Sequence, residues 1–359
     1  MLWSEFIIME TILVTVDSKA PKREVIEQAA HILKNGGLVA FPTETVYGLG
    51  ANGLDAVACK KIYEAKGRPS DNPLILHIAR KEALYDIVKN VPERAEKLID
   101  AFWPGPLTMI FEKKDCVPNE ITGGYSTVAV RFPSHKVAQH IIETSGLPIA
   151  APSANSSGKP SPTKASHVIF DLDGKIDMIV DGGNAEVGLE STILDVSGEI
   201  PMLLRPGAVT KEMIESVIGQ IEIDPTILSK PSNNIAPKAP GMKYTHYSPK
   251  ADVILVQGDN LDAVVQKIKQ LVKRDLQLGK KIGILATDQT KYNYDCGIVL
   301  SLGNRENLEE IGSHLFQHLR KFDFLGVETV YSETVPEIGE GLAIMNRLQK
   351  AAGYKVIKE

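Results

Sequence analysis

Apolar and polar positions repeat with two different periods in the first part of the chain, which indicates interleaved helices and strands. Apolar residues at spacings of i, i+4, i+7 and i+8 predict a helix over residues 18–37, and the Asn-Gly-Gly at 35–37 is typical of a helix end. Asp55 is a good N-cap for a second helix. A third helix is expected over 134–145, and strands are expected at 38–41, 74–78, from the 103–107 turn through Phe111, and at 127–132, 179–183 and 191–196. We therefore expect an α/β domain over residues 1–218.

The pattern changes in residues 219–250. This stretch is rich in Pro, Asn, Lys and Ser and shows no periodicity, so it predicts a linker or a long ordered loop. Beyond it the alternation resumes, which predicts a small, open, Rossmann-like α/β domain over residues 251–359. The expected strands are 252–257, 281–287, 297–302 and 327–333, and the expected helices lie near 260–275, 305–324 and 341–352.

Composition narrows the class of protein. The chain has 359 residues, a formal net charge of -5 and three widely spaced cysteines, Cys59, Cys116 and Cys296. The charge argues against a broad basic surface for nucleic acid, although small basic pockets remain compatible with it. The cysteine spacing argues against a disulfide framework or a zinc ribbon and favours the reducing cytoplasm. The apolar N-terminal segment is interrupted by Glu5 and Glu10, so we expect a strand there and no signal or membrane span.

Two glycine-rich stretches resemble nucleotide-binding loops without matching them. Residues 48–53, GLGANG, fit G-x-G-x-x-G, but PTETVY separates Gly48 from the preceding strand, whereas a dinucleotide fingerprint follows its strand directly. Residues 153–159, SANSSGK, fail as a P-loop because Ser153 replaces the first Gly and Pro160 replaces the Ser or Thr. The second stretch can still offer hydroxyl and N–H groups to an anion, or it is a plain surface loop.

Several cations stand where a purely structural role is not obvious. Lys66 and Arg68 fit a solvated helix end, but Gly67 and Pro69 stiffen the backbone around them, which suggests a more specific use. Arg131 and Arg205 end apolar strands, so each needs a structural carboxylate or an anionic ligand. By contrast, a lone histidine on an apolar strand, such as the one at 77, is more often a core residue than a ligand.

Seven loops in a fixed order carry a more specific signal than any one of them. They are FPTETVYGLG, KGRPSDNPLILHI, WPGPLT, VAVRFPSH, PIAAPSANSSGKPSPT, GLESTILD and LLRPGAV. Together they resemble the YrdC-like domain of the L-threonylcarbamoyladenylate synthases. APGMKYTHYSP at 239–249, followed by a small α/β domain, resembles the two-domain form of that family.

The resemblance implies a fold and a reaction. It implies a YrdC-like α/β domain with a twisted mixed sheet, residues 219–250 as a lid, and a nucleotidyltransferase that makes threonylcarbamoyl-AMP and pyrophosphate from L-threonine, bicarbonate and ATP. Mg²⁺ would accompany ATP, with no metal site formed by the protein alone. A separate complex would transfer the threonylcarbamoyl group to adenosine 37 of tRNA, so we expect neither direct RNA binding nor a membrane partner.

The resemblance also implies roles for individual residues. Lys66 and Arg68, helped by Asn72, would stabilise the phosphates and act as the catalytic residues. Residues implied to contact L-threonine are Thr43, Thr45, His77, Arg131 through the carboxylate, Ala151 through its main chain, and Ser191. Residues implied to line the nucleotide are Thr127, Ser153, Ser161, Arg205 and, closing over it from the lid, Tyr244.

Three other interpretations stay open at this stage. A YrdC-like domain could hold double-stranded RNA without chemistry, although the net charge of -5 counts against it. A carbamoyltransferase of hydrogenase maturation would need zinc fingers that three cysteines cannot build. A Rossmann oxidoreductase would rest on GLGANG alone.

Overall fold

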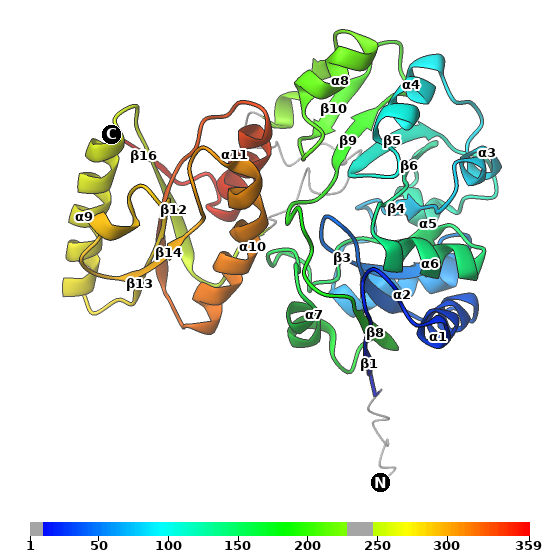
Figure 1. Ribbon diagram of the computed structural model, residues 1–359, viewed down its shortest axis with the longest axis horizontal. Coiled ribbons are helices and arrows are strands. Elements are labelled where there is room, and N and C mark those ends of the chain that lie inside the picture. Colours follow the sequence, from blue (N-terminus) through cyan, green and yellow to red (C-terminus); the bar gives the residue numbers. More distant parts are fainter. Residues whose placement is uncertain (1–9, 228–246) are drawn as a thin grey trace.

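The chain forms two α/β domains, each built on its own sheet (Figure 1). A computed structural model describes residues 10–227 and 247–359. The expected α/β class, with a large mixed sheet followed by a smaller open one, is confirmed. Within the described ranges, no helix is both long enough and apolar enough to cross a membrane.

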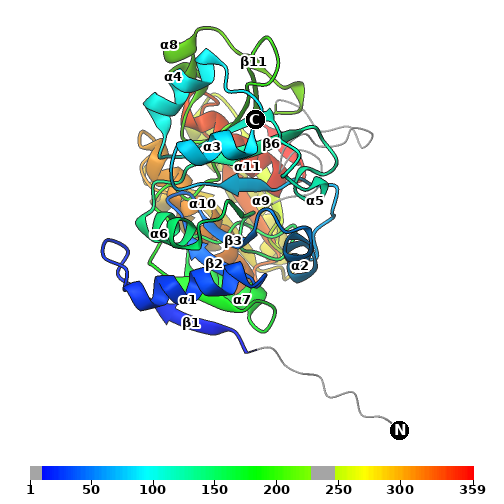
Figure 2. The ribbon, with the colours of Figure 1, turned by 90° about the vertical axis from the view of Figure 1, so that its right-hand side faces the viewer.

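The first sheet is mixed and has 11 strands in the described chain. In spatial order these are β1 (Ile12–Thr15), β8 (Met178–Asp181), β2 (Val39–Pro42), β3 (Tyr47–Asn52), β7 (Ile149–Ala150), β4 (Ile75–His77), β6 (Thr127–Arg131), β5 (Leu107–Glu112), β9 (Thr192–Asp195), β10 (Met202–Arg205) and β11 (Glu222–Ile223). Figure 2 shows β1 at one end of this sheet and β11 at the other.

Helices cover both faces of the first sheet. The helices are α1 (Arg23–Lys34), α2 (Ala56–Lys66), α3 (Glu82–Ile87), α4 (Glu93–Phe102), α5 (Asn119–Thr122), α6 (Lys136–Ser145), α7 (Ala165–Leu172) and α8 (Lys211–Ile218), with a 3-10 turn at Pro225–Ile227. Val39 and Phe41 pack with α1 and α6, whereas the alternating Leu38 and Ala40 pack in the cluster that holds α2 and α7. This alternation follows from the pleat of a strand that is buried on both faces.

The second sheet is parallel throughout the described residues. Its order is β14 (Ile298–Ser301), β13 (Ile282–Ala286), β15 (Thr329–Glu333), β12 (Asp252–Gln257) and β16 (Val356–Lys358). Its remaining elements are α9 (Leu261–Gln277), a 3-10 turn (Lys291–Asn293), α10 (Leu308–Phe324) and α11 (Glu340–Ala351). Helix α9 packs on one face, and α10 and α11 pack on the other. Figure 1 shows α10 and α11 between the two sheets, facing the N-terminal domain.

The domain boundaries predicted at 218 and 250 flank a segment that is only partly described. Strand β11 pairs with β10, so the first sheet continues past residue 218 to Ile223. Residues 228–246 lie outside the described residues, as does the start of the predicted N-terminal strand, residues 1–9. The two boundaries therefore stay predictions.

The glycine-rich stretch at 48–53 is not a nucleotide loop. Residues Tyr47–Asn52 form β3, which is antiparallel to both β2 and β7. A Cβ at Gly50 would lie 2.6 Å from Phe41, and one at Gly53 would lie 2.6 Å from the main-chain oxygen of Pro148. The glycines let neighbouring strands and side chains pack closely, which removes the basis for a Rossmann oxidoreductase.

Helix α2 positions the cations that follow it. Asp55 caps its start by accepting from the N–H groups of Val57 and Ala58, as predicted. The helix ends in a Schellman motif, in which the N–H of Gly67 bonds to Glu64 and that of Arg68 bonds to the carbonyl of Tyr63 at 2.9 Å. Gly67 adopts φ +62°, a left-handed conformation that glycine tolerates best. The chain therefore reverses direction at the residue before Arg68.

Candidate active site between the two domains

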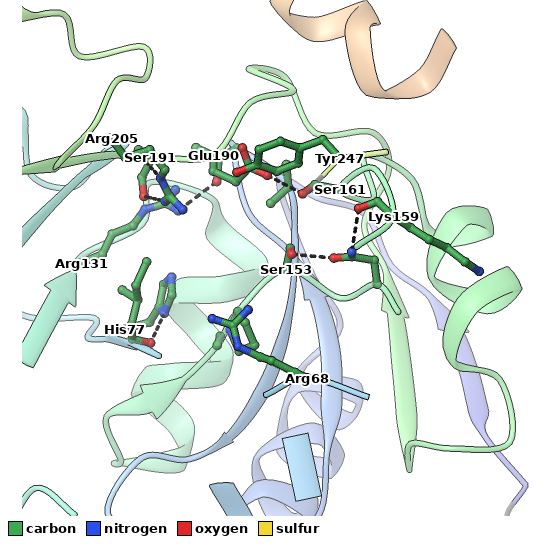
Figure 3. A pocket seen from close by; sticks show the side chains of 16 residues that line it. Arg68, His77, Arg131, Ser153, Lys159, Ser161, Glu190, Ser191, Arg205 and Tyr247 are labelled. Atoms are coloured by element: carbon green, nitrogen blue, oxygen red, sulfur yellow. Dashed lines mark hydrogen bonds between the residues drawn. The ribbon is translucent and has the colours of Figure 1, made fainter. Parts of the chain in front are cut away.

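A pocket lies beside the ends of several strands of the first sheet, where loops of the N-terminal domain meet Tyr247 (Figure 3). Its lining residues are Thr45, Val46, Arg68, Ile75, His77, Arg131, Ala151, Pro152, Ser153, Asn155, Lys159, Ser161, Glu190, Ser191, Arg205 and Tyr247. Nine of the residues predicted for the site are among them: Thr45, Arg68, His77, Arg131, Ala151, Ser153, Ser161, Ser191 and Arg205.

His77 and Arg131 lie side by side at the ends of two parallel strands. Strands β4 and β6 run in the same direction, with His77 in register with Arg131. Buried Arg131 donates from Nη1 to the Thr45 hydroxyl at 2.9 Å and forms an ion pair from Nη2 with Glu44 at 2.6 Å. The sequence left open a structural carboxylate or an anionic ligand for this arginine. Glu44 supplies the carboxylate, and the guanidinium still borders the pocket.

His77 is neutral in the folded protein at ordinary pH. Burial, with a smaller contribution from the charge of Arg131, lowers the pKa of His77 to about 3. Its Nδ1 lies 3.1 Å from the carbonyl oxygen of Ile75. A neutral imidazole beside a cation can donate or accept a hydrogen bond without adding charge to the pocket.

The turn between β2 and β3 presents one hydroxyl to the pocket and uses another to hold itself. The Thr43 hydroxyl donates to the carbonyl of Val46 at 2.7 Å and lies 2.8 Å from the hydroxyl of Thr45. Thr43 therefore fixes the turn, and Thr45 lines the pocket.

Arg68 enters the pocket from the loop that follows α2. Its guanidinium donates to the carbonyls of Asn72 and Pro73 at 3.3 and 3.0 Å. Burial lowers the pKa of Arg68 to about 10, so the group stays charged at neutral pH. Asn72 is buried and holds Arg68 through its main chain, while its side-chain Oδ1 meets no hydrogen-bond partner among the described residues.

Lys66 lies behind the pocket and not on its surface. Its Nζ donates to the carbonyl oxygens of Ser153 and Asn155, the second at 2.6 Å. Burial, followed by repulsion from Arg68, holds the pKa of Lys66 well below its usual value. Lys66 therefore supports the loop that carries Ser153, whereas Arg68 faces the cavity.

Glu190 belongs to the loop GLESTILD, but the sequence predicted no role for it. It is the only acidic side chain among the described lining residues. It accepts from the hydroxyl of Ser161 and forms an ion pair with Arg347 of α11 at 3.1 Å. Burial alone would raise the pKa of Glu190, but the charges of Arg347 and Arg205 and the bond from Ser161 bring it below its usual value. Glu190 is therefore an anion held by partners from both domains.

Ser191 and Arg205 form a bonded pair at the start of β9 and the end of β10. Arg205 donates from Nε to the Ser191 carbonyl at 3.0 Å and from Nη2 to its hydroxyl at 3.1 Å. The same hydroxyl lies 2.7 Å from that of Thr108. Burial lowers the pKa of Arg205 to about 10, which leaves it charged at neutral pH.

Tyr247 closes the side of the pocket that faces the C-terminal domain. It has φ +65°, rare for a residue with a side chain, and its ring stacks on Phe316 of α10 with centroids 5.1 Å apart. Burial raises the pKa of Tyr247 to about 12. Tyr244, predicted to close over the nucleotide, lies outside the described residues.

Four predicted residues do not line the pocket. Thr43, Lys66 and Asn72 are buried behind it and hold residues that do. Thr127 begins β6, four positions before Arg131, so about 13 Å separates their Cα atoms. The sequence predicted no role for Lys159, Asn155 or Tyr247, which also line the pocket. The one feature that could have indicated them is that they lie in loops that resemble the family.

Metal ions in proteins are commonly held by groups of His, Cys, Asp or Glu side chains. The described residues contain no group of three such side chains arranged to hold an ion. Glu190, the carboxylate at the pocket, is already bonded to Ser161 and Arg347.

Comparisons with known proteins cover nearly the whole chain. A family profile described as "Telomere recombination" matches residues 31–207, and one described as "Threonylcarbamoyl-AMP synthase, C-terminal domain" matches residues 209–353. Threonylcarbamoyl-AMP synthase of Pyrococcus abyssi is 52% identical over 94% of this chain and 98% of its own, and that of Bacillus subtilis is 50% identical over 93% and 94%. The crystal structure of P. abyssi Sua5 complexed with L-threonine matches with a TM-score of 0.92 and 50% identity, covering 97% of this chain and 100% of that one.

Proposed function

The chain belongs to the threonylcarbamoyl-AMP synthase family, and on that premise we propose that its pocket joins L-threonine, bicarbonate and ATP into threonylcarbamoyl-AMP and releases pyrophosphate. The observation that carries the proposal is the charge of the pocket. Its described lining includes three guanidinium groups, those of Arg68, Arg131 and Arg205, and one carboxylate, Glu190, whereas the ammonium of Lys159 points away from the cavity and pairs with Asp171 (Figure 3). This excess of positive charge suits three substrates that are all anionic or carry a carboxylate.

L-Threonine would bind at the end of the pocket formed by β4 and β6. Arg131 would bind its carboxylate beside Thr45, since a guanidinium that already bonds Glu44 and Thr45 is held in a fixed orientation. His77 and Ser191 would contact the polar groups of the amino acid, and the main chain of Ala151 would contribute further contacts. Thr43 acts through Thr45, with which it shares a hydrogen bond of 2.8 Å.

ATP would bind on the side of the pocket formed by Arg68 and the 153–161 loop. Arg68 would face the phosphates. Ser153, Ser161 and Arg205 would line the nucleotide, whereas Lys66 and Asn72 would hold the loops that carry these groups. Contacts from Thr127 and Tyr244 stay predictions from the family resemblance.

The chemistry requires alignment and charge stabilisation more than proton removal. The amine of threonine and bicarbonate give a carbamate with loss of water, and a carbamate oxygen attacks the α-phosphorus while the bond to pyrophosphate breaks. The nucleophile is already anionic, so no strong base is needed, which agrees with a His77 that stays neutral. Arg68 and its neighbours would stabilise the negative charge on the transferring and leaving phosphates.

Mg²⁺ belongs to the proposal as a companion of ATP. It would supply further charge neutralisation to the phosphates. The residues of this chain would bind and orient the nucleotide, with Glu190 holding Ser161 in place.

The reactivity of the product indicates that another enzyme uses it soon after release. Threonylcarbamoyl-AMP is a mixed anhydride that hydrolyses readily, so a complex that transfers its threonylcarbamoyl group to adenosine 37 of tRNA is the proposed partner, in the cytoplasm. This chain then has no need to grip RNA, which is consistent with its net charge of -5. The family relationship spans the C-terminal domain as well, which favours the synthase over a double-stranded RNA module.

Pyrophosphate release by the purified protein tests the proposal. The assay supplies ATP and Mg²⁺ and omits L-threonine, bicarbonate or both. Release is expected only when both are present. Release without either would indicate a plain pyrophosphohydrolase and contradict the proposed reaction.

A further inference from the structure

Two arginines of the C-terminal domain are buried against loops of the N-terminal domain. Arg320 lies on α10 and is 9% exposed, and Arg347 lies on α11 and is 0% exposed. These are the two helices that face the first domain (Figure 1). A buried guanidinium is costly without partners, and both arginines find theirs across the domain boundary.

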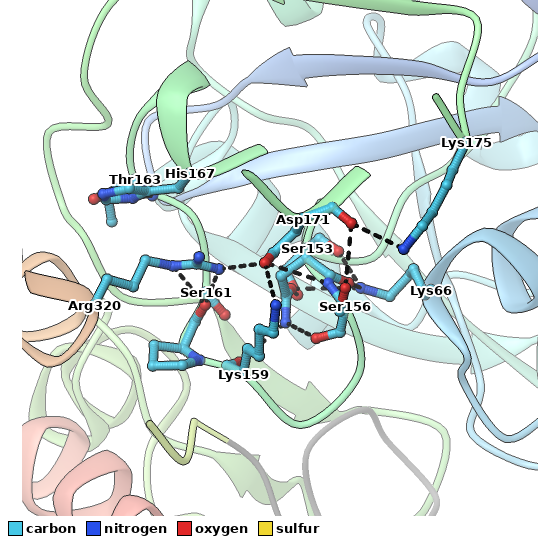
Figure 4. Close-up of polar contacts among 12 residues, drawn as sticks. Lys66, Ser153, Ser156, Lys159, Ser161, Thr163, His167, Asp171, Lys175 and Arg320 are labelled. Atoms are coloured by element: carbon cyan, nitrogen blue, oxygen red, sulfur yellow. Dashed lines mark hydrogen bonds and ion pairs between the residues drawn. The ribbon is translucent and has the colours of Figure 1, made fainter. Parts of the chain in front are cut away.

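Arg320 holds the loop that forms one wall of the pocket (Figure 4). It donates from Nε and Nη2 to the carbonyl oxygen of Pro160 at 3.0 and 2.5 Å, and Nη2 forms an ion pair with Asp171 at 2.8 Å. Asp171 also accepts from the N–H of Ser156 at 3.3 Å and forms an ion pair with Lys159 at 2.7 Å. Arg320 thus fixes this loop both directly and through Asp171.

Arg347 reaches the same segment indirectly, through Glu190. It donates from Nε to Glu190 Oε2 at 3.1 Å, from Nη2 to the Glu190 carbonyl at 3.4 Å, and from Nη1 to the Pro206 carbonyl at 2.7 Å. The other carboxylate oxygen of Glu190 accepts from the hydroxyl of Ser161. The orientation of Ser161 in the pocket therefore depends on Arg347 through one intervening carboxylate.

The two arginines converge on consecutive residues, Pro160 and Ser161. We propose that Arg320 and Arg347 are positioning residues for the reaction: from the C-terminal domain they fix the loop segment 159–161, and with it the hydroxyl of Ser161, on the nucleotide side of the pocket. The inference rests on the proposed function, because it takes this side as the ATP site. It gives the C-terminal domain a defined part in substrate binding.

The contacts of Arg320 predict an asymmetric kinetic effect. Arg320 contacts Pro160 and Asp171 beside the nucleotide loop, whereas Arg131 on the threonine side is held by Glu44 and Thr45. Loss of Arg320 should therefore weaken ATP binding and leave threonine binding largely intact. A merely structural role would lower the fraction of folded protein and change neither KM selectively.

The test compares Arg320→Gln and Arg347→Gln in the full-length chain with Arg274→Gln. Arg274 is exposed on α9, on the other face of the second sheet, and pairs with its neighbour Asp275. Equilibrium binding of a fluorescent ATP analogue, pyrophosphate release at varied ATP and threonine, and thermal melting are measured on each. Arg320→Gln should raise Kd for the analogue and KM for ATP on the order of tenfold, with KM for threonine within about twofold. Arg274→Gln should match the wild type, and Arg320→Lys should recover part of the loss.

Several results would overturn the inference. One is unchanged affinity for the ATP analogue in folded Arg320→Gln and Arg347→Gln. Another is equal loss of all activities in proportion to the folded fraction. If Arg320→Gln does not fold, Arg320→Lys decides, because it keeps the charge but loses the paired donation to Pro160. Should the wild type bind the analogue but release no pyrophosphate, the proposed function fails, and analogue affinity still decides the inference.

Discussion

Lys66 and Arg68 stand two residues apart in the sequence, but the fold gives their charges different tasks. The Nζ of Lys66 is bonded to main-chain carbonyls of the 153–155 loop, whereas the guanidinium of Arg68 lines the cavity. The sequence does not reveal this difference, since the two cations lie in the same short loop. The difference arises because the 153–155 loop, almost 90 residues away in the chain, packs against Lys66.

Because of this difference, we expect replacement of Lys66 to affect mainly stability and replacement of Arg68 to affect mainly activity. Lys66→Met should lower the free energy of unfolding by about 2 kcal/mol or more, because the carbonyls of Ser153 and Asn155 lose their donor. Arg68→Met should have a smaller effect on stability and should lower kcat/KM for ATP at least tenfold, or about 1.4 kcal/mol of transition-state stabilisation. Urea denaturation and pyrophosphate release measure both. A Lys66→Met protein with wild-type stability would contradict the assignment.

His77 gives a prediction for acid stability. The pKa of His77 is about 3 in the fold, against 6.5 for an ordinary histidine. As the pH falls from 6.5 toward 3, the unfolded chain binds a proton that the folded chain does not, so stability is lost across that window. His77→Gln should therefore lose less stability than the wild type between pH 7 and pH 4, as measured by urea denaturation at each pH. Parallel pH profiles for the two proteins would show that His77 does not titrate differently in the fold.

At the scale of elements, periodicity located α1, α2, α6, α9, α10 and α11 and most buried strands, but it missed β3 and the helices α3, α4, α5, α7 and α8. Tyr47–Asn52 contains two glycines, which are depleted in strands, and its pairing with β2 and β7 decides its structure. The seven loops that resemble the family contain the nine predicted residues that line the pocket, and each of these loops follows or precedes a strand. Glu190 and Arg347 are 157 residues apart, and no local pattern reveals such a pair.

The close packing directly after β3 predicts a cost for adding a side chain to Gly53, the residue that follows this strand. Gly53→Ala should destabilise the protein by about 1–3 kcal/mol, because the new Cβ would lie 2.6 Å from a main-chain oxygen and 2.5 Å from Leu76. Gly198→Ala is the matched control, since the nearest atom there is 3.8 Å away. The measurement is thermal or urea unfolding of both variants. Equal stability of the two would mean that the close approach at Gly53 is not rigid.

At the scale of the whole molecule, the two domains share one site. A single apolar cluster contains Val46 and Leu189 of the first domain together with Phe316 and Leu315 of α10. Buried ion pairs from α10 and α11 flank that cluster on the side of the pocket. The helices of the C-terminal domain therefore pack against the loops that form the cavity and hold them by buried ion pairs.

The central claim is that this one cavity links threonine, bicarbonate and ATP. The most direct measurement incubates the protein with ATP, Mg²⁺, L-threonine and ¹³C-bicarbonate and analyses the products by mass spectrometry. The account predicts threonylcarbamoyl-AMP with one ¹³C in its carbamoyl group, at a yield strongly reduced in Arg131→Gln and Arg68→Met. Formation of ADP or AMP without a labelled threonine adduct would contradict it.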